Sequence, residues 1–245
     1  MTESACTICM TAPGDVSTGH VGAPLPCCEV KLADIPDMRY THADAPHPRG
    51  EICVRGPIVF RGYHKAERQT AEVLDGEGWL HTGDVGTWLP GGRLRIIDRK
   101  KNIFKLAQGE YIAPEKLEAV FGRAPLVAQV FVYGDSLKAQ LVAVAVPDAD
   151  VLLPWAAERG MSQDVAALCG DAAVRAAVLR GMQQEGAAAR LKGFEQVAAV
   201  HLTPEAFTVE NGLLTPSFKL KRPQAKAAFE AELAAMYRAL DGLAA

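Results

Sequence analysis

The chain changes character at Arg95-Ile-Ile-Asp-Arg-Lys-Lys-Asn-Ile-Phe-Lys105, where a strand-like run leads into a group of basic residues. The tetrapeptide His81-Thr-Gly-Asp84 lies shortly before it. An acidic side chain after a Thr-Gly turn is well placed to accept both hydroxyls of a ribose, and the cations that follow can meet phosphates. Together these residues indicate a nucleotide-binding site. The cations are Arg95, Arg99, Lys100, Lys101 and Lys105.

The same residues also fit a simpler interpretation. The basic group can be a solvated turn that closes a β-hairpin, and the aspartate can be a turn former after glycine. Composition alone favours this simpler reading, because most runs of charge are solvated surfaces. The preference is reversed only by the other motifs of the chain and by the order in which they occur.

The pattern on either side of Lys101 predicts an α+β fold. Before it, short strands and turns dominate, with strands at residues 51–55 and 93–97 bracketed by Gly, Pro and Asp. After it, helices and strands mix, with Ser162 as an expected helix N-cap and Pro223 opening a single closing helix. The later elements are expected at residues 113–121 (helix), 127–133 and 141–146 (strands), 150–192 (helical), 195–202 (strand) and 223–240 (helix).

Composition narrows the classes of function. A formal net charge of −3 and a pI near 6.1 argue against broad nucleic-acid binding, which needs a basic surface. No apolar run approaches the ~18 residues that suggest a membrane span, and residues 141–146 are followed at once by Pro147 and Asp148. The N-terminal residues lack the pattern of a secretory leader, so a reducing, cytosolic-side compartment is expected.

The six cysteines allow two interpretations. Cys6-Thr-Ile-Cys9 followed by Cys27-Cys28 resembles two thiolate pairs of a zinc site. Adjacent cysteines in an extended segment point to opposite faces, which spoils the second pair. Buried free thiols are therefore favoured, because free cysteine packs as a small apolar side chain.

Five blocks of sequence carry a resemblance to the adenylate-forming (AMP-binding) superfamily, and within it to the long-chain fatty acyl-CoA synthetases. Each block is weak alone, but all five occur in the family's order and at similar spacings. The wording Thr-Pro-Ser-Phe-Lys favours the long-chain acyl branch, because many superfamily members have Gly where this chain has Phe218. The blocks are Met1-Thr-Glu-Ser4, Gly19-His-Val-Gly-Ala-Pro24, Gly50-Glu-Ile-Cys-Val-Arg-Gly56 with Gly62-Tyr63, Gly78-Trp-Leu-His-Thr-Gly-Asp84 with Ile97-Asp-Arg-Lys-Lys101, and Asn211-Gly-Leu-Leu-Thr-Pro-Ser-Phe-Lys-Leu-Lys-Arg222.

The resemblance implies that the chain is the C-terminal part of a larger enzyme. The triphosphate-binding loop and the acyl pocket of the family match nothing in it. Residues 1–97 are then the β-rich end of a large adenylating domain, residues 98–101 a hinge and residues 102–245 a small mobile α+β domain. Taken alone, such a fragment is expected to be inactive. The pivot is expected at Lys101, because hinges are a few residues at the ends of elements.

The resemblance also assigns roles in activating a fatty acid with ATP. Lys219 is similar to the catalytic lysine, set against the reacting carboxylate and the α-phosphate. Glu3 resembles the carboxylate that helps to hold Mg²⁺, and Thr2 a donor to the α-phosphate. Asp84 is expected to accept the ribose hydroxyls, and Arg99 to contact the ribose and phosphate region.

The second half of the reaction is thioester formation with coenzyme A. Gly109 lies in a loop that is expected to approach the CoA arm after the domain rotates. The implied function is a long-chain fatty acid:CoA ligase that releases AMP and pyrophosphate. It implies peripheral membrane association of the full protein, at the cytosolic face of the endoplasmic reticulum or another organelle. The alternatives are another adenylate former, luciferase-like or of the peptide-synthetase type, and a non-catalytic nucleotide- or CoA-binding module. The sequence does not indicate an oligomeric state.

Overall fold

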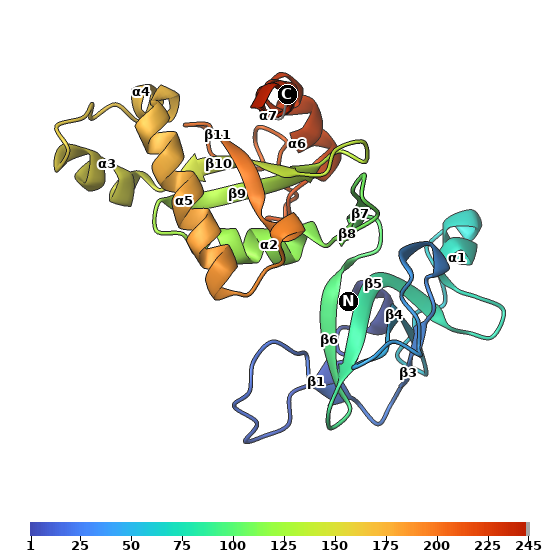
Figure 1. Cartoon of the computed structure of the whole chain (residues 1–245). Helices are drawn as coiled ribbons and strands as arrows, with labels where there is room; N and C mark the ends of the chain where they lie inside the picture. Colours follow the sequence, from blue (N-terminus) through green and yellow to red (C-terminus); the bar gives the residue numbers. More distant parts are fainter. Residues whose placement is uncertain (244–245) are drawn as a thin grey trace. The chain divides into compact units, whose positions relative to one another are not determined.

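The computed structural model describes residues 1–243, which divide into two compact units. The first unit runs from Met1 to Ile103, and the second begins at Phe104 (Figure 1). No helix within residues 1–243 combines the length and the apolar character that crossing a membrane requires.

The first unit is built on an antiparallel sheet in the order β3-β4-β5-β6. Its core strand β4 carries a run of buried side chains, and Ile52 and Val54 pack with Leu94 of β6. The β5–β6 hairpin turns at Gly91 and Gly92, both at positive φ, which glycine adopts without a steric cost. The elements are η1 (Thr2–Ser4), β1 (Cys9–Met10), β2 (Ala23–Pro24), β3 (Glu29–Ala33), η2 (Pro36–Met38), β4 (Arg49–Arg55), α1 (Glu67–Val73), β5 (Leu80–Leu89) and β6 (Arg93–Arg99).

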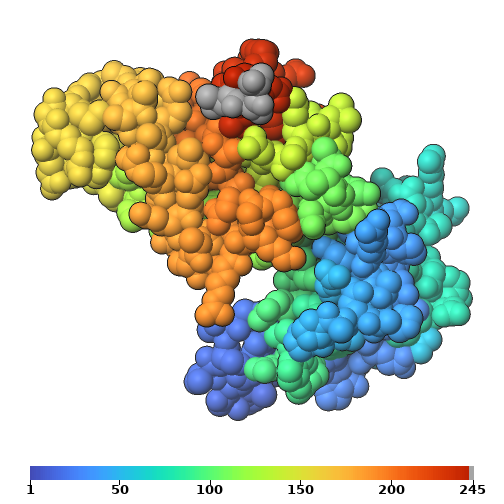
Figure 2. Space-filling view, in the orientation of Figure 1, coloured from blue at the N-terminus to red at the C-terminus, as the bar shows by residue number. Residues whose placement is uncertain are grey.

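The second unit has a three-stranded sheet in the order β11-β10-β9, with β10 parallel to β11 and antiparallel to β9. A short β7–β8 hairpin precedes it, and helices complete the unit. In the space-filling view α3, α4 and α5 form one continuous surface (Figure 2). The elements are β7 (Phe104–Lys105), β8 (Tyr111–Ile112), α2 (Pro114–Phe121), β9 (Val127–Gly134), β10 (Leu141–Pro147), α3 (Ala149–Ala157), α4 (Val165–Gly170), α5 (Ala172–Ala188), η3 (Gly193–Glu195), β11 (Val197–Leu202), α6 (Arg222–Ala228) and α7 (Glu230–Leu243).

Strand β10 is the centre of the second unit because both of its faces are buried. Alternate side chains of a strand point to opposite faces. Leu141, Ala143 and Ala145 join the core formed with α2, α3, α4 and α5, whereas Val142 and Val144 join the core formed with α6 and α7. A strand covered on both faces reads as a continuous apolar run, which is the pattern of this segment.

The predicted α+β class is confirmed, and most of the predicted elements are present. Two predictions at helix ends were wrong. Asp164 caps α4 and Asp171 caps α5, while the Ser162 hydroxyl only accepts the Asp164 backbone N–H. The closing helix is divided into α6 and α7 at Phe229, whose ring packs 5.9 Å from that of Phe207. Helix α6 begins one residue before Pro223.

The prediction of buried free thiols is wrong in its burial for the four cysteines of the possible zinc motif. All four are free, but Cys6 and Cys27 are exposed and Cys9 and Cys28 half-buried, because this part of the first unit consists of loops and two-residue strands. Cys53 and Cys169, outside that motif, are buried and free. Within residues 1–243, no three or more His, Cys, Asp or Glu side chains are grouped as metal ligands.

Candidate functional site

Asp84 is positioned by an irregularity within β5, where the register with β4 shifts between the pairs Glu51–Val85 and Cys53–His81. Gly83 has a φ of 71°, which lets the strand bulge between Thr82 and Asp84. The Thr82 hydroxyl donates to the Ile52 carbonyl at 2.8 Å and accepts the Asp84 backbone N–H at 3.1 Å. The Thr-Gly-Asp segment is therefore tied to the neighbouring strand β4, and the direction of the Asp84 side chain is set by the sheet.

Arg99 lies directly opposite Asp84 in the register between β5 and β6. Its Nε is 2.9 Å from Asp84 Oδ1, and both side chains remain partly exposed. The buried Asp98 carboxylate accepts the Arg99 backbone N–H at 2.6 Å, which steadies the end of the strand. The structure thus brings together the two residues that were predicted to face the ribose and its phosphate.

Glu51 is a supporting residue that the sequence analysis missed. It is 7% exposed and lies on β4, next to the Thr-Gly-Asp segment of β5. Its carboxylate accepts the Gly83 backbone N–H at 3.3 Å and the Lys100 Nζ at 3.0 Å, and the Lys100 backbone N–H donates to the Gly83 carbonyl. The available signal was a single charged residue at the head of the apolar run Ile52-Cys-Val54.

The five cations do not all remain available for phosphates. In the first unit Arg95 donates to the Gly19 carbonyl at 2.8 Å, while Arg99 and Lys100 form ion pairs with Asp84 and Glu51. Lys101 is exposed in the turn after β6. Lys105 belongs to the second unit, where its Nζ lies 5.5 Å from the centre of the Tyr111 ring.

Glu3 is held by contacts with the segment that follows β4. The Tyr63 hydroxyl donates to Glu3 Oε1 at 2.8 Å, and the Phe60 backbone N–H donates to the Glu3 carbonyl at 2.8 Å. This hydrogen bond to Glu3 raises the pKa of Tyr63. Thr2, its neighbour, is exposed. Mg²⁺ prefers oxygen ligands and binds through one or two carboxylates together with substrate phosphates. A single oriented carboxylate at Glu3 fits that requirement.

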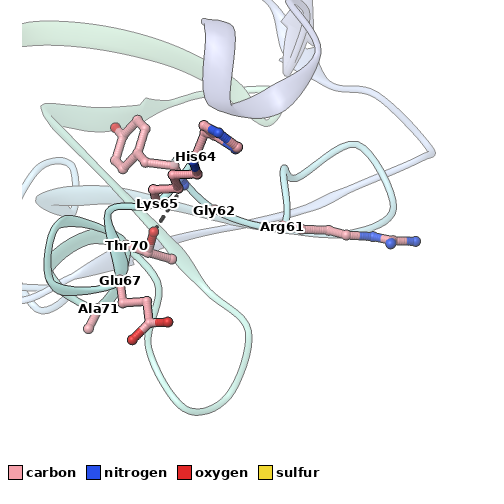
Figure 3. A pocket seen from close by; sticks show the side chains of 8 residues that line it. Arg61, Gly62, His64, Lys65, Glu67, Thr70 and Ala71 are labelled. Atoms are coloured by element: carbon pink, nitrogen blue, oxygen red, sulfur yellow. Dashed lines mark hydrogen bonds between the residues drawn. The ribbon is translucent and has the colours of Figure 1, made fainter.

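A surface pocket of about 490 Å³ lies beside Tyr63 (Figure 3). The Tyr63 backbone N–H donates to Thr70 Oγ1 at 2.9 Å, and Gly62 packs against the same threonine with no room for a Cβ. The Arg61 side chain extends away from Thr70 and Glu67, so the cations around the pocket do not converge on one point. The pocket walls therefore serve to hold Tyr63. They are Arg61, Gly62, Tyr63, His64, Lys65, Glu67, Thr70 and Ala71.

Gly109 lies at the tip of the β7–β8 hairpin in the second unit. Its φ is 90°, a conformation that side chains rarely adopt, and its N–H donates to the Leu106 carbonyl at 2.9 Å. The Ala107 backbone N–H donates to the Lys138 carbonyl at 3.0 Å, which ties the tip to the β9–β10 connection. The hairpin tip thus has a defined shape.

Lys219 projects from a tight turn between β11 and α6. Its carbonyl accepts the Thr215 N–H at 2.8 Å, and its own N–H donates to Thr215 Oγ1 at 3.0 Å. Leu214 and Leu220 form an antiparallel bridge just beyond these contacts. The lysine side chain is exposed on a turn whose backbone is closed by hydrogen bonds on both sides.

Phe218, immediately before Lys219, has a φ of 59° and a side chain that is 77% exposed. A left-handed backbone is unfavourable for a residue with a Cβ. The geometry explains why glycine suits this position in many members of the superfamily that the motif resembles. It also shows that the phenylalanine of this chain preserves the turn at a steric cost.

Comparisons with known proteins agree with these motifs. The model of the AMP-binding enzyme family matches residues 1–64. Long chain acyl-CoA synthetase 6, peroxisomal, of Arabidopsis thaliana is 61% identical over 98% of this chain. The chain belongs to the AMP-binding, adenylate-forming family. Another member, long-chain-fatty-acid–CoA ligase 1 of Homo sapiens, is 51% identical over 96% of the chain.

The adenylate-forming fold is also seen in a solved structure. The A domain of a carboxylic acid reductase from Segniliparus rugosus, in complex with AMP and a co-purified carboxylic acid, matches 86% of this chain and 32% of that chain, with a TM-score of 0.76 and 36% identity. This chain spans about a third of the length of its curated relatives, 34% of the Arabidopsis protein and 33% of the human one.

Proposed function

We propose that this chain supplies the C-terminal part of an ATP-dependent long-chain fatty acid:CoA ligase. The observation that carries the proposal is the match to the Arabidopsis synthetase, at 61% identity over 98% of the chain. The ligase joins a fatty acid to coenzyme A in two steps, adenylation of the carboxylate and then thioester formation, and it releases pyrophosphate and AMP.

The first step overcomes the poor reactivity of a carboxylate as an acyl donor. The fatty carboxylate attacks the α-phosphorus of ATP, pyrophosphate departs, and the acyl group acquires AMP as a leaving group. Such a transfer is promoted mainly by positioning and by neutralising charge. Asp84 accepts the ribose hydroxyls while its other contact to Arg99 keeps the carboxylate oriented. Thr2 donates to the α-phosphate from its exposed position beside Glu3.

Lys219 provides the positive charge that this step needs. As a mobile ammonium on an exposed turn, it approaches the reacting carboxylate and the α-phosphate, where negative charge increases in the transition state. Glu3 is the residue of this chain that holds Mg²⁺, which when bound neutralises charge on the phosphates. Tyr63 keeps the Glu3 carboxylate oriented through its 2.8 Å hydrogen bond.

The second step exchanges AMP for the thiol of coenzyme A. In this proposal the second unit changes orientation about Lys101, which lies in an exposed turn two residues before the boundary between the units. Gly109, at the hairpin tip, then lies against the CoA arm, because a glycine permits close approach of the backbone.

We assign this ligase to the cytosolic face of an intracellular membrane such as the endoplasmic reticulum, because its fatty substrate partitions into lipid. Residues 1–245 do not resemble the triphosphate loop or the acyl pocket of the family, and the isolated chain is therefore expected to be inactive.

The proposal is tested in a full-length ligase made by replacing the matching region of the Arabidopsis synthetase with this chain. We expect this chimera to form palmitoyl-CoA from palmitate, ATP and CoA, with AMP as the nucleotide product, and the chain alone to form none. A folded chimera that makes no acyl-adenylate would contradict the proposal. Turnover by the purified chain alone would contradict the division of the site between this chain and upstream residues.

A further inference from the structure

A nearly buried ion pair joins two distant segments of the second unit. Glu118 lies on α2, and Arg222 is the first residue of α6. The Arg222 guanidinium donates through Nη2 to Glu118 Oε2, and each side chain is only 14% exposed. The two residues are 104 positions apart in the sequence. A pair of this kind depends on its partners being held closely, because neither charge is well solvated.

The pair binds both backbone polar groups of one residue of β9. The Val132 N–H donates to Glu118 Oε1 at 2.8 Å, and the Val132 carbonyl accepts from Arg222 Nη1 at 3.4 Å. In an antiparallel strand the N–H and the carbonyl of one residue point to the same side. Strand β9 is at the edge of its sheet. The two side chains thus take the place of a neighbouring strand at Val132.

Arg222, one partner of this ion pair, lies three residues after Lys219. Between them, the Lys221 N–H donates to the Leu213 carbonyl at 2.8 Å, and Leu220 is bridged to Leu214. Beyond them, the fully buried Ala225 fixes the first turn of α6 in the core. The Lys219 turn is therefore closed by its own hydrogen bonds to Thr215, and the chain that leaves it is held next by the Lys221 hydrogen bond and then by the Arg222 ion pair.

We propose that Arg222, held by Glu118, is a positioning residue for Lys219. The contacts of the guanidinium fix the backbone where the chain leaves the Lys219 turn. The orientation of the exposed Lys219 side chain depends on that backbone. Lysine at position 222 cannot reproduce this arrangement, because an ammonium lacks the planar fork that contacts a carboxylate and a carbonyl together. The step at which Lys219 acts, adenylation, is taken from the proposed function. The coupling of Arg222 to the Lys219 turn does not depend on it.

A purely structural role for the pair makes a different prediction. Loss of general stability lowers both half-reactions together, whereas misplacement of Lys219 lowers adenylation selectively. The test therefore separates the half-reactions in the full-length chimera. Adenylation is followed by exchange of labelled pyrophosphate into ATP, and thioester formation by supplying synthetic palmitoyl-adenylate with CoA.

We expect Arg222→Gln to slow adenylation by about 10²-fold, the effect of a small misplacement of a reacting group, and to leave thioester formation within about threefold. Arg222→Lys should behave similarly, although it keeps the charge. The matched control is Lys226→Gln, which removes an exposed cation from the same helix and should leave both steps near the parent rates. Equal losses in both steps, or no loss in adenylation, would overturn the proposal.

A second measurement uses the 245-residue chain itself and does not depend on catalysis. Hydrogen exchange should be faster at the Lys219 and Lys221 amides in Arg222→Gln, while the central amides of β10 stay protected. If Arg222→Gln unfolds the unit, Glu118→Gln, which keeps the side-chain shape, provides the same comparison. Unchanged exchange in the 215–221 turn would also overturn the proposal. An inactive parent chimera would instead count against the proposed function, since this exchange measurement remains interpretable.

Discussion

Asp84 is paired with Arg99 across the β5–β6 hairpin, with 2.9 Å between Oδ1 and Nε. The two residues are direct partners in the strand register, so their separation is set by the sheet. An ionised carboxylate has several acceptor sites, and one contact to arginine leaves capacity for ribose hydroxyls. The pairing therefore orients the carboxylate, as the proposed contact with a ribose requires.

The first prediction concerns this carboxylate. In the full-length chimera Asp84→Asn should raise the KM for ATP about tenfold or more, since a hydrogen bond to a charged group contributes about 1.5–3 kcal/mol. Steady-state kinetics with varied ATP measures the effect. The control Glu77→Gln changes an exposed acid elsewhere in the same unit and should leave the KM for ATP unaltered. Equal effects of the two variants would refute the assignment of Asp84.

The second prediction concerns Lys219. Lys219→Ala should slow adenylation by about 10²–10³-fold, the cost typical of losing one group that stabilises developing charge. Thioester formation from supplied palmitoyl-adenylate should be affected far less. Lys192→Ala, a lysine in another loop of the same unit, serves as the control. Pyrophosphate exchange near the parent rate in Lys219→Ala would exclude the role.

The third prediction concerns the turn at Lys101. Proline restricts φ at its own position and the backbone of the residue before it. Lys101→Pro should therefore impair thioester formation more than adenylation if the units reorient at this turn. Lys101→Ala, which removes the charge but keeps the freedom of the backbone, should be close to the parent in both steps. An equal loss of rate in both steps for the proline variant would contradict the assignment of Lys101 as the hinge.

The fourth prediction follows from the burial of Glu118. Burial raises the pKa of Glu118 to about 7 from an ordinary value of 4.5, although Arg222 and the Val132 N–H oppose the rise; the nearby Glu115 adds to it. Because the pKa is higher in the folded state, this group stabilises the fold most below about pH 4.5. That contribution is lost as the pH rises through about 7.

The measurement compares the parent chain with Glu118→Gln, which cannot titrate. Urea denaturation of the second unit should show that the parent loses about 3 kcal/mol of unfolding free energy relative to this variant between pH 4.5 and 8. Glu158→Gln, at an exposed position at the end of α3 in the same unit, should follow the parent. Parallel pH profiles for the parent and Glu118→Gln would show that Glu118 does not titrate in this range.

The fifth prediction concerns Phe218. At a φ of 59°, removing the Cβ relieves a strain of about 1 kcal/mol. Phe218→Gly should therefore be more stable than Phe218→Ala by about that amount, which is the reverse of the usual order in regular structure. Thermal or urea unfolding of the two variants gives the comparison. An alanine variant as stable as the glycine variant would mean that the turn relaxes out of the left-handed region.

The sequence by itself determined the α+β class and most elements of the fold. The apolar run of residues 141–146 predicted a strand, and the pattern of residues 113–121 predicted the helix α2. Such signals are local, because strand alternation, helix periodicity and turn chemistry act over a few residues. The order of the five blocks also determined the family, since each block preserves a short piece of backbone geometry.

Only the tertiary structure decided which charged groups meet. Glu51 and Lys100 are 49 positions apart, and Glu118 and Arg222 are 104 apart, so no local pattern pairs them. The break at Phe229 has the same origin, because the ring packs on Phe207 from another segment. The residues on both sides of Phe229 favour a helix, so the local sequence does not predict the break. Contacts of this kind depend on strand register and on how helices cover a sheet, which are settled by packing over the whole unit.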